Sequence, residues 1–461
     1  MTRMIALLLA LTLSAAGLTA CAQDGSDSAA RSATPAPLAD AALAQPTYPK
    51  LTPYPTETAY LAADGSFDSD GFSAAYDAWQ KEQQTLRQQP EGYQDGLWQF
   101  YQQCLPAFFQ DGQTENELCS PLNLYLALSM LTEVTDGDSR AQLQAVLGSQ
   151  DQAVLREQAH ALWNANYNDD GAVTCRLAAS LWLDDQVPYQ QTTLDTLVNH
   201  YYASAFQGDM GSPSYNQAFQ SWLNEQTGGM LTEQAEGMEL PPDTLLALAT
   251  TLFYRAQWST QFQAANTKAE CFHGAEGDVT CDFLHQSGDD AYFWGDQFTA
   301  IAQGLENSGS MWFFLPKDGI APKELLQDKQ VQQLLQAPNR WEQMDYVIVN
   351  RSIPKFDITS DLNLRDSLES LGVTAVFDQR QADFSPLTET EQPVYLSQAQ
   401  HTARVTIDEE GCAAAAFTVM AVEAMSMPPQ KEVDFRLDRP FLFVLTGEDG
   451  TPLFVGIVRQ P

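Results

Sequence analysis

The side chains that most often bind metal ions or act as nucleophiles are sparse in this sequence, which holds seven cysteines and five histidines. The cysteines after the first stand at positions 104, 119, 175, 271, 281 and 412, with no CxxC pair and no zinc-finger spacing. The sequence contains no His-Glu-x-x-His, no Gly-x-Ser-x-Gly and no phosphate-binding glycine loop. It therefore predicts no metal site, no cofactor and no catalytic residue, and the protein is not expected to be an enzyme.

Two of the cysteines, Cys271 and Cys281, flank a predicted hairpin that turns at residues 274–277. An exported protein could close a disulfide between them, and the sequence leaves this pairing open. The other cysteines are expected to be small buried apolar side chains.

A different kind of chemistry is indicated by a run of small residues that follows an acidic pair. The run is Glu409, Glu410, Gly411, Cys412, Ala413, Ala414, Ala415, Ala416, Phe417 and Thr418. In a β-strand, every second side chain from Cys412 to Ala424 would share one face, and all of them are small or apolar. A shift by one residue would bury Glu423 unpaired, at a cost of about a few kcal/mol, so the pattern selects one register. Taken alone, however, the four alanines favour a surface helix, because Ala is a strong helix former.

The first twenty residues are typical of an export signal. Arg3 supplies a short positive region, and residues 5–13 form an apolar stretch that is too short to span a bilayer comfortably. Leu18-Thr19-Ala20 followed by Cys21 resembles the lipobox of bacterial lipoproteins, in which the cysteine becomes the acylated first residue. The expectation is a protein that is exported and lipid-anchored through Cys21 at the outer face of a bacterial cell. If the lipid signal is misread, the protein would be secreted.

The rest of the chain divides by composition into a tether and a folded domain. Residues 21–92 are expected to be a flexible tether, because 22–49 are rich in Ala, Ser, Asp, Thr and Pro without apolar periodicity. Within it, Ala75–Arg87 could form an extra, mostly exposed helix. Residues 93–461 have the texture of a compact domain.

The charge balance is strongly acidic, with 60 Asp and Glu against 23 Lys and Arg and a formal net charge of −37. Such a surface repels nucleic acid, whose binding depends on Lys and Arg neutralising phosphates. It also disfavours anionic lipid headgroups, so a membrane contact is expected only through the N-terminal lipid. The acidity by itself indicates solubility.

Apolar periodicity within the domain predicts helices early in the chain and strands late. Helices are expected over 98–109, 122–131 and 139–147, the last of them ended by Gly148. Strands are expected over 310–315, 346–349 and 440–445. This order favours a single α+β domain rather than alternating βαβ units.

Short motifs in the domain resemble those of the serpin family, and they follow the family's order from about Leu97 to Pro461. Each motif alone is a weak signal, and their order and spacing together are specific. The motifs are Asn116-Glu117-Leu118-Cys119-Ser120-Pro121, Ser221–Gly229 (Trp-x-x-x-x-Thr-x-Gly), Leu252–Trp258, Ile353-Pro354-Lys355-Phe356, Leu371–Phe377 with Ala382–Ser385, Arg439–Phe443 and Pro452–Gly456.

The resemblance implies the serpin fold, an α+β architecture. It has a large central mixed β-sheet with further sheets, helices packed around them and an exposed reactive-centre loop. It also implies a polar cluster that latches the main sheet, made here of Ser120, Asn123, Thr250 and His401. Asn123 and Thr250 stand where the family usually has Ser and Asn. The cluster is therefore expected to hydrogen-bond in a different arrangement.

The same resemblance makes Glu409–Thr418 the hinge of the reactive loop. Counting fourteen residues beyond Gly411, as the family counts, puts the scissile bond at Met425-Ser426. The stretch Glu423–Pro429 is similar to the loop of the family's antitrypsin members. The implied activity is irreversible suicide-substrate inhibition. The serine of the target protease attacks the carbonyl of Met425 and forms an acyl-enzyme, and insertion of the cleaved loop into the main sheet then traps it.

The expected partner is a serine protease with an apolar primary specificity pocket, of the elastase, chymotrypsin or subtilisin kind. Unbranched Met enters apolar pockets of several shapes, and no Arg or Lys lies near the bond. The inhibitor is expected to act as a monomer. Two alternatives remain: a non-inhibitory serpin that acts as a carrier or chaperone, and a surface lipoprotein that binds a small ligand.

Overall fold

The computed structural model describes residues 36–110, 112–412 and 431–461. The predicted signal peptide, Cys21, the hinge residues after Cys412 and the Met425-Ser426 bond lie outside the described residues.

Helices are more frequent in the first half of the described chain, and the helices of both halves are given together here. They are α1 (Ala36–Ala41), η1 (Glu57–Tyr60), α2 (Ser69–Leu86), α3 (Asp95–Gln103), η2 (Leu105–Phe108), α4 (Pro121–Val134), α5 (Gly137–Leu147), α6 (Gln152–Asn166), α7 (Gln191–Tyr201), α8 (Pro213–Gln226), α9 (Thr232–Ala235), η3 (Ala264–Asn266), η4 (Pro322–Gln327), α10 (Lys329–Gln336), η5 (Pro338–Arg340), α11 (Leu364–Ser370) and η6 (Ala375–Phe377).

Strands are more frequent in the second half, and the strands of both halves are given together here. They are β1 (Ala42–Ala44), β2 (Glu117–Cys119), β3 (Asn168–Asp169), β4 (Thr174–Asp184), β5 (Ser204–Gly208), β6 (Leu246–Gln257), β7 (Lys268–Gly274), β8 (Gly277–Trp294), β9 (Phe298–Gly304), β10 (Ser310–Pro316), β11 (Met344–Pro354), β12 (Phe356–Asn363), β13 (Gln398–Ile407), β14 (Gly411–Cys412), β15 (Glu432–Arg436), β16 (Phe441–Thr446) and β17 (Pro452–Val458). The helices expected over 122–131 and 139–147 and the three expected strands are confirmed, and Gly148 ends α5 in the left-handed conformation at φ 75°. The helix expected over 98–109 is divided at Cys104 into α3 and the 3-10 helix η2.

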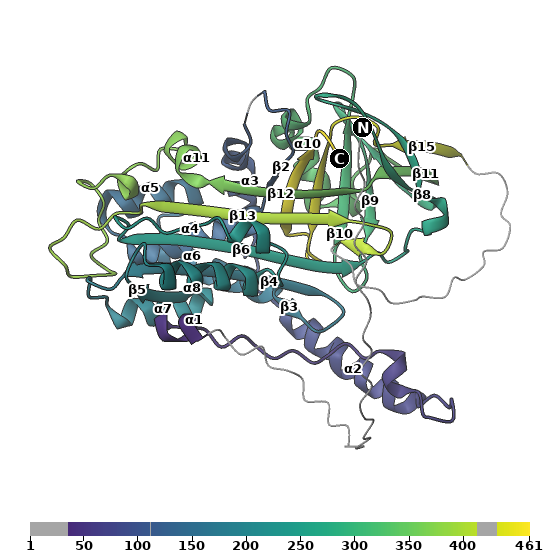
Figure 1. Ribbon diagram of the computed structural model, residues 1–461. Coiled ribbons are helices and arrows are strands. Elements are labelled where there is room, and N and C mark those ends of the chain that lie inside the picture. Colours follow the sequence, from purple (N-terminus) through teal and green to yellow (C-terminus); the bar gives the residue numbers. More distant parts are fainter. Residues whose placement is uncertain (1–35, 111, 413–430) are drawn as a thin grey trace, which may run out of the picture. The chain divides into compact units, whose positions relative to one another are not determined.

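Two mixed sheets organise the part of the chain that the structure describes (Figure 1). The main sheet has eight strands in the order β1-β5-β4-β6-β14-β13-β12, with β3 paired to β4. The second sheet has nine strands in the order β15-β11-β8-β9-β10-β16-β17-β2, with β7 paired to β8. The expected α+β class with a large central mixed sheet is confirmed.

Helix α4 lies between the two sheets and contacts β6 of the main sheet and β17 of the second. Ser120 caps its N-terminus by accepting a hydrogen bond from the backbone N–H of Asn123, and Pro121 fills the first helical position, where it loses no bond. Every residue of α4 is buried, as expected for a helix that is apolar on all sides. Its start is therefore held against the underside of the main sheet.

Residues 36–49 are part of the expected flexible tether, but in the structure they pack against the folded domain. Strand β1 pairs antiparallel with β5 at the edge of the main sheet, and Leu38 is buried in the apolar cluster beneath α8. Farther along, the ring of Tyr48 stacks on Trp163 at 5.9 Å. The apolar residues of this segment are too few to give a periodic signal. Their partners are more than a hundred residues away along the chain, so no local sequence signal predicts that β1 pairs with β5 at the edge of the sheet.

The exposed helix expected over Ala75–Arg87 is α2, in which only Trp79 and Gln83 are buried. The indole N–H of Trp79 donates to Oδ2 of Asp170 at 2.9 Å, and the ring of Tyr54 packs edge-on against it at 5.1 Å. Trp79 is therefore the main anchor of α2 on the domain.

Replacing Trp79 by Ala is expected to lower the free energy of unfolding by about 3 kcal/mol, because it removes a buried indole and leaves the Asp170 carboxylate without this donor. Denaturant unfolding of the purified protein measures the change. The exposed neighbour Gln80→Ala is the control and is expected to have little effect. An unchanged transition in the Trp79 variant would contradict the packing of α2.

The hairpin expected at 274–277 is formed by β7 and β8, but it does not bring Cys271 and Cys281 together. Cys271 is opposite Thr280, and Cys281 is opposite Glu270. Because side chains alternate between the faces of a strand, the two thiols lie on opposite faces of the hairpin, and both cysteines are free. The disulfide left open by the sequence is not formed.

Among the helices that the structure describes, none combines the length and the apolar character needed to cross a membrane.

Candidate functional site

The main sheet is closed at one end and open at the other, between β6 and β13 (Figure 1). At the closed end the two strands pair in parallel, from Ala247 with Gln398 to Leu252 with Ala403. Beyond this point β14 lies between them: Cys412 pairs antiparallel with Ala256 of β6 and with Ile407 of β13. Gly411 and Cys412 of the predicted hinge are therefore already a short strand at the centre of the sheet.

The chain enters the gap through a turn that is tied to the end of β6. The carboxylate of Asp408 accepts hydrogen bonds from the backbone N–H groups of Glu410, at 2.8 Å, and Gly411, at 3.1 Å. Trp258 donates its indole N–H to the carbonyl of Asp408 at 2.8 Å and its backbone N–H to that of Glu410 at 2.9 Å. The Glu409 side chain accepts from Lys355 at 2.9 Å and from Thr267 at 2.7 Å. These contacts fix the starting point of the hinge.

Gly411 is required at this point because a Cβ would collide with the carbonyl oxygen of Ala256. Cys412 follows with its side chain turned into the core and 1% exposed. Burial, with a smaller contribution from the charge of Asp408, raises the pKa of the Cys412 thiol to about 12, so the thiol remains neutral. The face predicted for Cys412 is the buried one.

Burial alternates along both strands that border the gap. On β6, Tyr254 and Ala256 are buried, and the residues between and beside them are partly exposed. On β13, Val405 and Ile407 alternate in the same way with partly exposed neighbours. The gap therefore has an apolar inner side and a more open outer side, and Cys412 occupies the inner one.

Three of the four residues predicted to latch the sheet are brought together at its closed end. The backbone N–H of Ser120 donates to Nε2 of His401 at 3.1 Å, and Nδ1 of His401 lies 3.3 Å from the Thr250 hydroxyl oxygen. Because Nε2 accepts, the neutral ring carries its proton on Nδ1 and donates it to Thr250. His401, which lies on β13, thus links the start of α4 to β6, the strand that pairs with β13.

Asn123 is also buried in this region, but its side chain is not part of the hydrogen-bonded chain. Only its backbone N–H bonds to Ser120, at 3.2 Å, and its amide nitrogen Nδ2 is buried without a partner. The position of the residue was predicted, but its side-chain contact is not present.

Complete burial lowers the pKa of His401 to about 4, from an ordinary value of 6.5. Below pH 6.5 the unfolded chain takes up a proton that the folded chain refuses. Stability is therefore lost as the pH falls from 6.5 to about 4, by an amount on the order of 3 kcal/mol. Denaturant unfolding at several pH values, compared between the wild type and His401→Gln, isolates this contribution. Parallel pH profiles for the two proteins would contradict the assignment.

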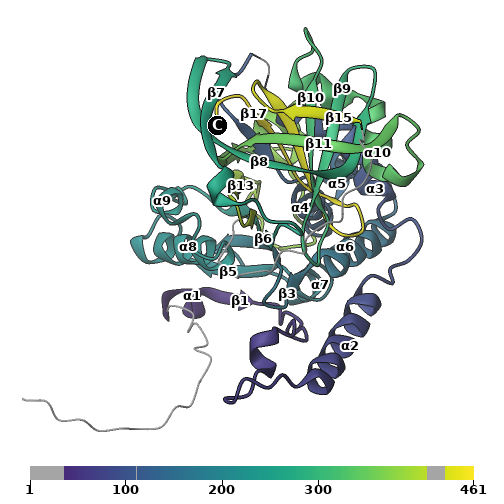
Figure 2. The same cartoon turned by 90° about the vertical axis from the view of Figure 1, so that its right-hand side faces the viewer.

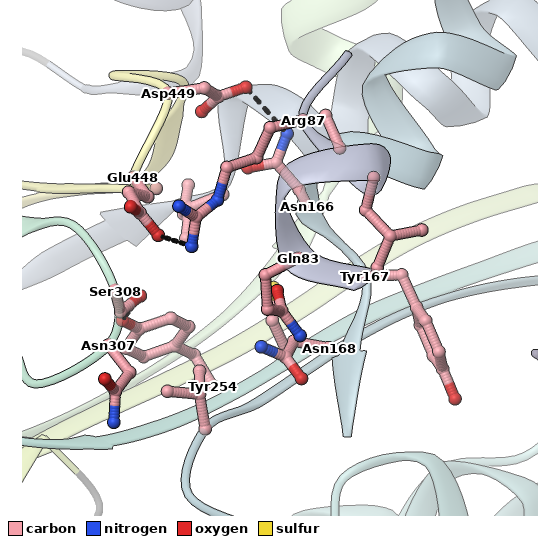
Figure 3. Close-up of a pocket in the computed structure, with 16 residues that line it drawn as sticks. Gln83, Arg87, Asn166, Tyr167, Asn168, Tyr254, Asn307, Ser308, Glu448 and Asp449 are labelled. Atoms are coloured by element: carbon pink, nitrogen blue, oxygen red, sulfur yellow. Dashed lines mark hydrogen bonds and ion pairs between the residues drawn. The ribbon is translucent and has the colours of Figure 1, made fainter. Parts of the chain in front are cut away.

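A polar cavity under α2 contains residues that the sequence did not single out (Figure 3). Arg87, which follows the last residue of α2, forms an ion pair with Glu448 (Figure 3). Inside, the amide nitrogens of Gln83 and Asn307 are buried without hydrogen-bond partners. Among the lining residues there is one thiol, the buried Cys175, and no histidine. The cavity lies at the end of β6 away from the closed half of the sheet. No sequence motif marks it, because its lining comes from helices, strands and turns that are far apart in the chain.

Comparisons with known proteins agree with this geometry. The family model described as "Serpin (serine protease inhibitor)" matches residues 97–461. The chain is 29% identical over 364 residues to mouse alpha-1-antitrypsin 1-2, which covers 76% of this chain and 84% of that protein. The native crystal structure of a thermophilic serpin, tengpin, superposes with a TM-score of 0.72 at 22% identity, over 81% of this chain and 95% of tengpin. Human thyroxine-binding globulin complexed with thyroxine gives 0.68 at 22% identity, over 79% and 98%.

The main sheet is thus closed over one half by the pairing of β6 with β13, and in the other half Cys412 lies between these two strands. The chain belongs to the serpin family. Members of this family are mostly protease inhibitors rather than enzymes.

Proposed function

We propose that the protein is an irreversible suicide-substrate inhibitor of serine proteases. In this proposal the target protease cleaves the Met425-Ser426 bond and is held as an acyl-enzyme on Met425, while residues 413–424 enter the main sheet. The observation that carries the proposal is the position of β14, because it supplies the first two residues of such a strand between β6 and β13.

The registers at the gap are compatible with continued insertion. Extending β14 along β6 and β13 would lay Ala416 between Leu252 and Ala403, which now pair with each other. Thr418 would then lie between Thr250 and His401, which also pair now. Each alignment follows independently from the β14–β6 and β14–β13 registers, and the two agree. The new strand can therefore hydrogen-bond to both neighbours without a bulge.

Insertion would replace one strand pairing by two. The parallel pairing from Ala247 to Leu252 would be lost, together with the contact of His401 with Thr250. Each gained sheet bond contributes about 1 kcal/mol net, so a full-length strand gains several times the cost of opening the sheet. The latch at His401 then acts as the barrier that keeps the gap closed until the loop is cut.

The proposed partners are elastase-, chymotrypsin- or subtilisin-like proteases, since Met425 suits an apolar pocket. The test mixes the protein with one enzyme of each kind and follows the products by denaturing gel and intact mass. The expected result is a covalent adduct near the sum of the two masses and a released peptide that begins at Ser426. Cleavage at this bond by every protease without a stable adduct would refute inhibition and favour a non-inhibitory carrier or chaperone.

We further propose that the mature chain is anchored by a lipid on Cys21 at the outer face of a bacterial cell. The support is the sequence Leu18-Thr19-Ala20-Cys21 after an apolar stretch. Metabolic labelling with a palmitate analogue should mark the wild type and leave Cys21→Ser unmarked. Equal labelling of both would exclude this anchor.

A further inference from the structure

The outer face of the β7–β8 hairpin carries three different metal-binding side chains at one point. Cys271 and His273 are two residues apart on β7 and share a face, and Asp278 of β8 is directly opposite His273. Nδ1 of His273 lies 2.7 Å from Oδ1 of Asp278 and 3.9 Å from Sγ of Cys271. All three atoms lie within 4.8 Å of one another.

From this juxtaposition we propose that Cys271, His273 and Asp278 bind a divalent transition-metal ion, with zinc as the best fit. A zinc ion bonds sulfur at about 2.3 Å and nitrogen or oxygen at about 2.0–2.2 Å, so ligands around one ion stand roughly 3–4 Å apart. The three atoms already have nearly this spacing. Small side-chain rotations bring them around a single ion, and a water completes four-coordination on the solvent side.

The ligand set selects the kind of metal. Calcium and magnesium require shells of oxygen atoms, and this site offers only one carboxylate in contact with a thiol and an imidazole. Sulfur and nitrogen ligands favour zinc and its transition-metal neighbours, including cobalt.

The backbone holds the three side chains in place. The two strands pair from Lys268 with Phe283 down to the tight turn at Gly274 and Gly277. The backbone N–H of His273 is also bonded to the carbonyl of Asp438, at 2.7 Å. The site is therefore built on a hairpin fixed at its turn and tied to the segment that follows β15. Figure 2 shows β7 at the margin of the second sheet.

The local field favours a cation. Asp278 and Asp438 bring negative charge close to Cys271. The guanidinium of Arg436 is also near, but it is engaged by Glu270 at 2.8 Å and by Asp438 at 3.5 Å. The chain as a whole carries a formal charge of −37, which raises the local concentration of divalent cations. A surface contact between His and Asp contributes little to the stability of a protein. Stability therefore does not explain why Cys271 lies beside His273 and Asp278.

Cobalt titration of the purified full-length protein, kept reduced, tests the thiol. Bound through Cys271, Co²⁺ should give thiolate-to-metal absorption in the near ultraviolet that saturates at about one equivalent. Cys271→Ser should abolish the band. Cys281→Ser is the matched control, since Cys281 is a free thiol in the same hairpin with its side chain on the opposite face. No band in the wild type, or a full band in Cys271→Ser, would overturn the proposal.

Zinc affinity, measured by competition with a chelating dye, tests the other two ligands. His273→Gln and Asp278→Asn should each weaken binding at least about 10-fold. Asp282→Asn, an exposed acid on the same face of β8, should leave the affinity unchanged. The unfolding midpoint of the wild type should rise with added zinc, and that of Cys271→Ser should not. Equal affinity in wild type, His273→Gln and Asp278→Asn would exclude this site. These readouts do not depend on protease inhibition.

Discussion

Replacing Ala414 by Glu is expected to convert the inhibitor into a substrate. Continuing the register of β14 puts residue 414 between Tyr254 and Val405, both buried on the inner side of the gap. A carboxylate carried there would be buried with no cation beside it, at a cost of several kcal/mol. Even about 3 kcal/mol in the barrier slows insertion more than 100-fold, so hydrolysis of the acyl-enzyme overtakes trapping.

The measurement is the ratio of covalent adduct to cleaved inhibitor at a fixed excess of protease. Ala413→Glu is the matched control, because residue 413 would lie between Arg255 and Thr406, which are both partly exposed. It carries the same charge one residue away and should still form the adduct. If both variants trap the protease equally well, the predicted alternation of faces is wrong.

Replacing Met425 by Arg is expected to redirect the inhibitor to trypsin-like proteases. Their primary pocket carries a carboxylate at its base, which pairs with Arg and gives nothing to a thioether. The relative rate of adduct formation with trypsin over elastase should rise at least about 100-fold, because the charged side chain is also excluded from an apolar pocket.

The control for this prediction is Met427→Arg, which adds the same charge two residues away and should leave the preference nearly unchanged. Competition between the two enzymes for a limiting amount of inhibitor measures the switch. A switch in Met427→Arg and not in Met425→Arg would show that the reactive bond follows Met427 instead of Met425. No switch in either variant would contradict a reactive bond in this part of the loop.

Local features of the structure were largely predictable from the sequence. The start of α4 follows from Ser120 and Pro121, which cap and open a helix wherever an apolar run follows them. The end of α5 follows from Gly148, and the face of Cys412 follows from alternation along the hinge. Each of these depends on neighbours within a few residues.

The latch was predicted only in part. Ser120, Thr250 and His401 were placed together by resemblance to the family, and the structure brings them together. The sequence could not predict that the amide nitrogen of Asn123 lacks a hydrogen-bond partner, because the rotamer of this side chain is set by the packing around α4 and not by its position in the motif.

The sequence by itself determined the α+β class of the fold and the buried face of Cys412, since these depend on periodicity and on side-chain size. Tertiary structure alone decided three other features: the pairing of β1 with β5, the separation of Cys271 from Cys281, and the meeting of Cys271 and His273 with Asp278. In each case the deciding quantity is a strand register. A shift of one residue there exchanges the two faces, and short motifs do not encode that register.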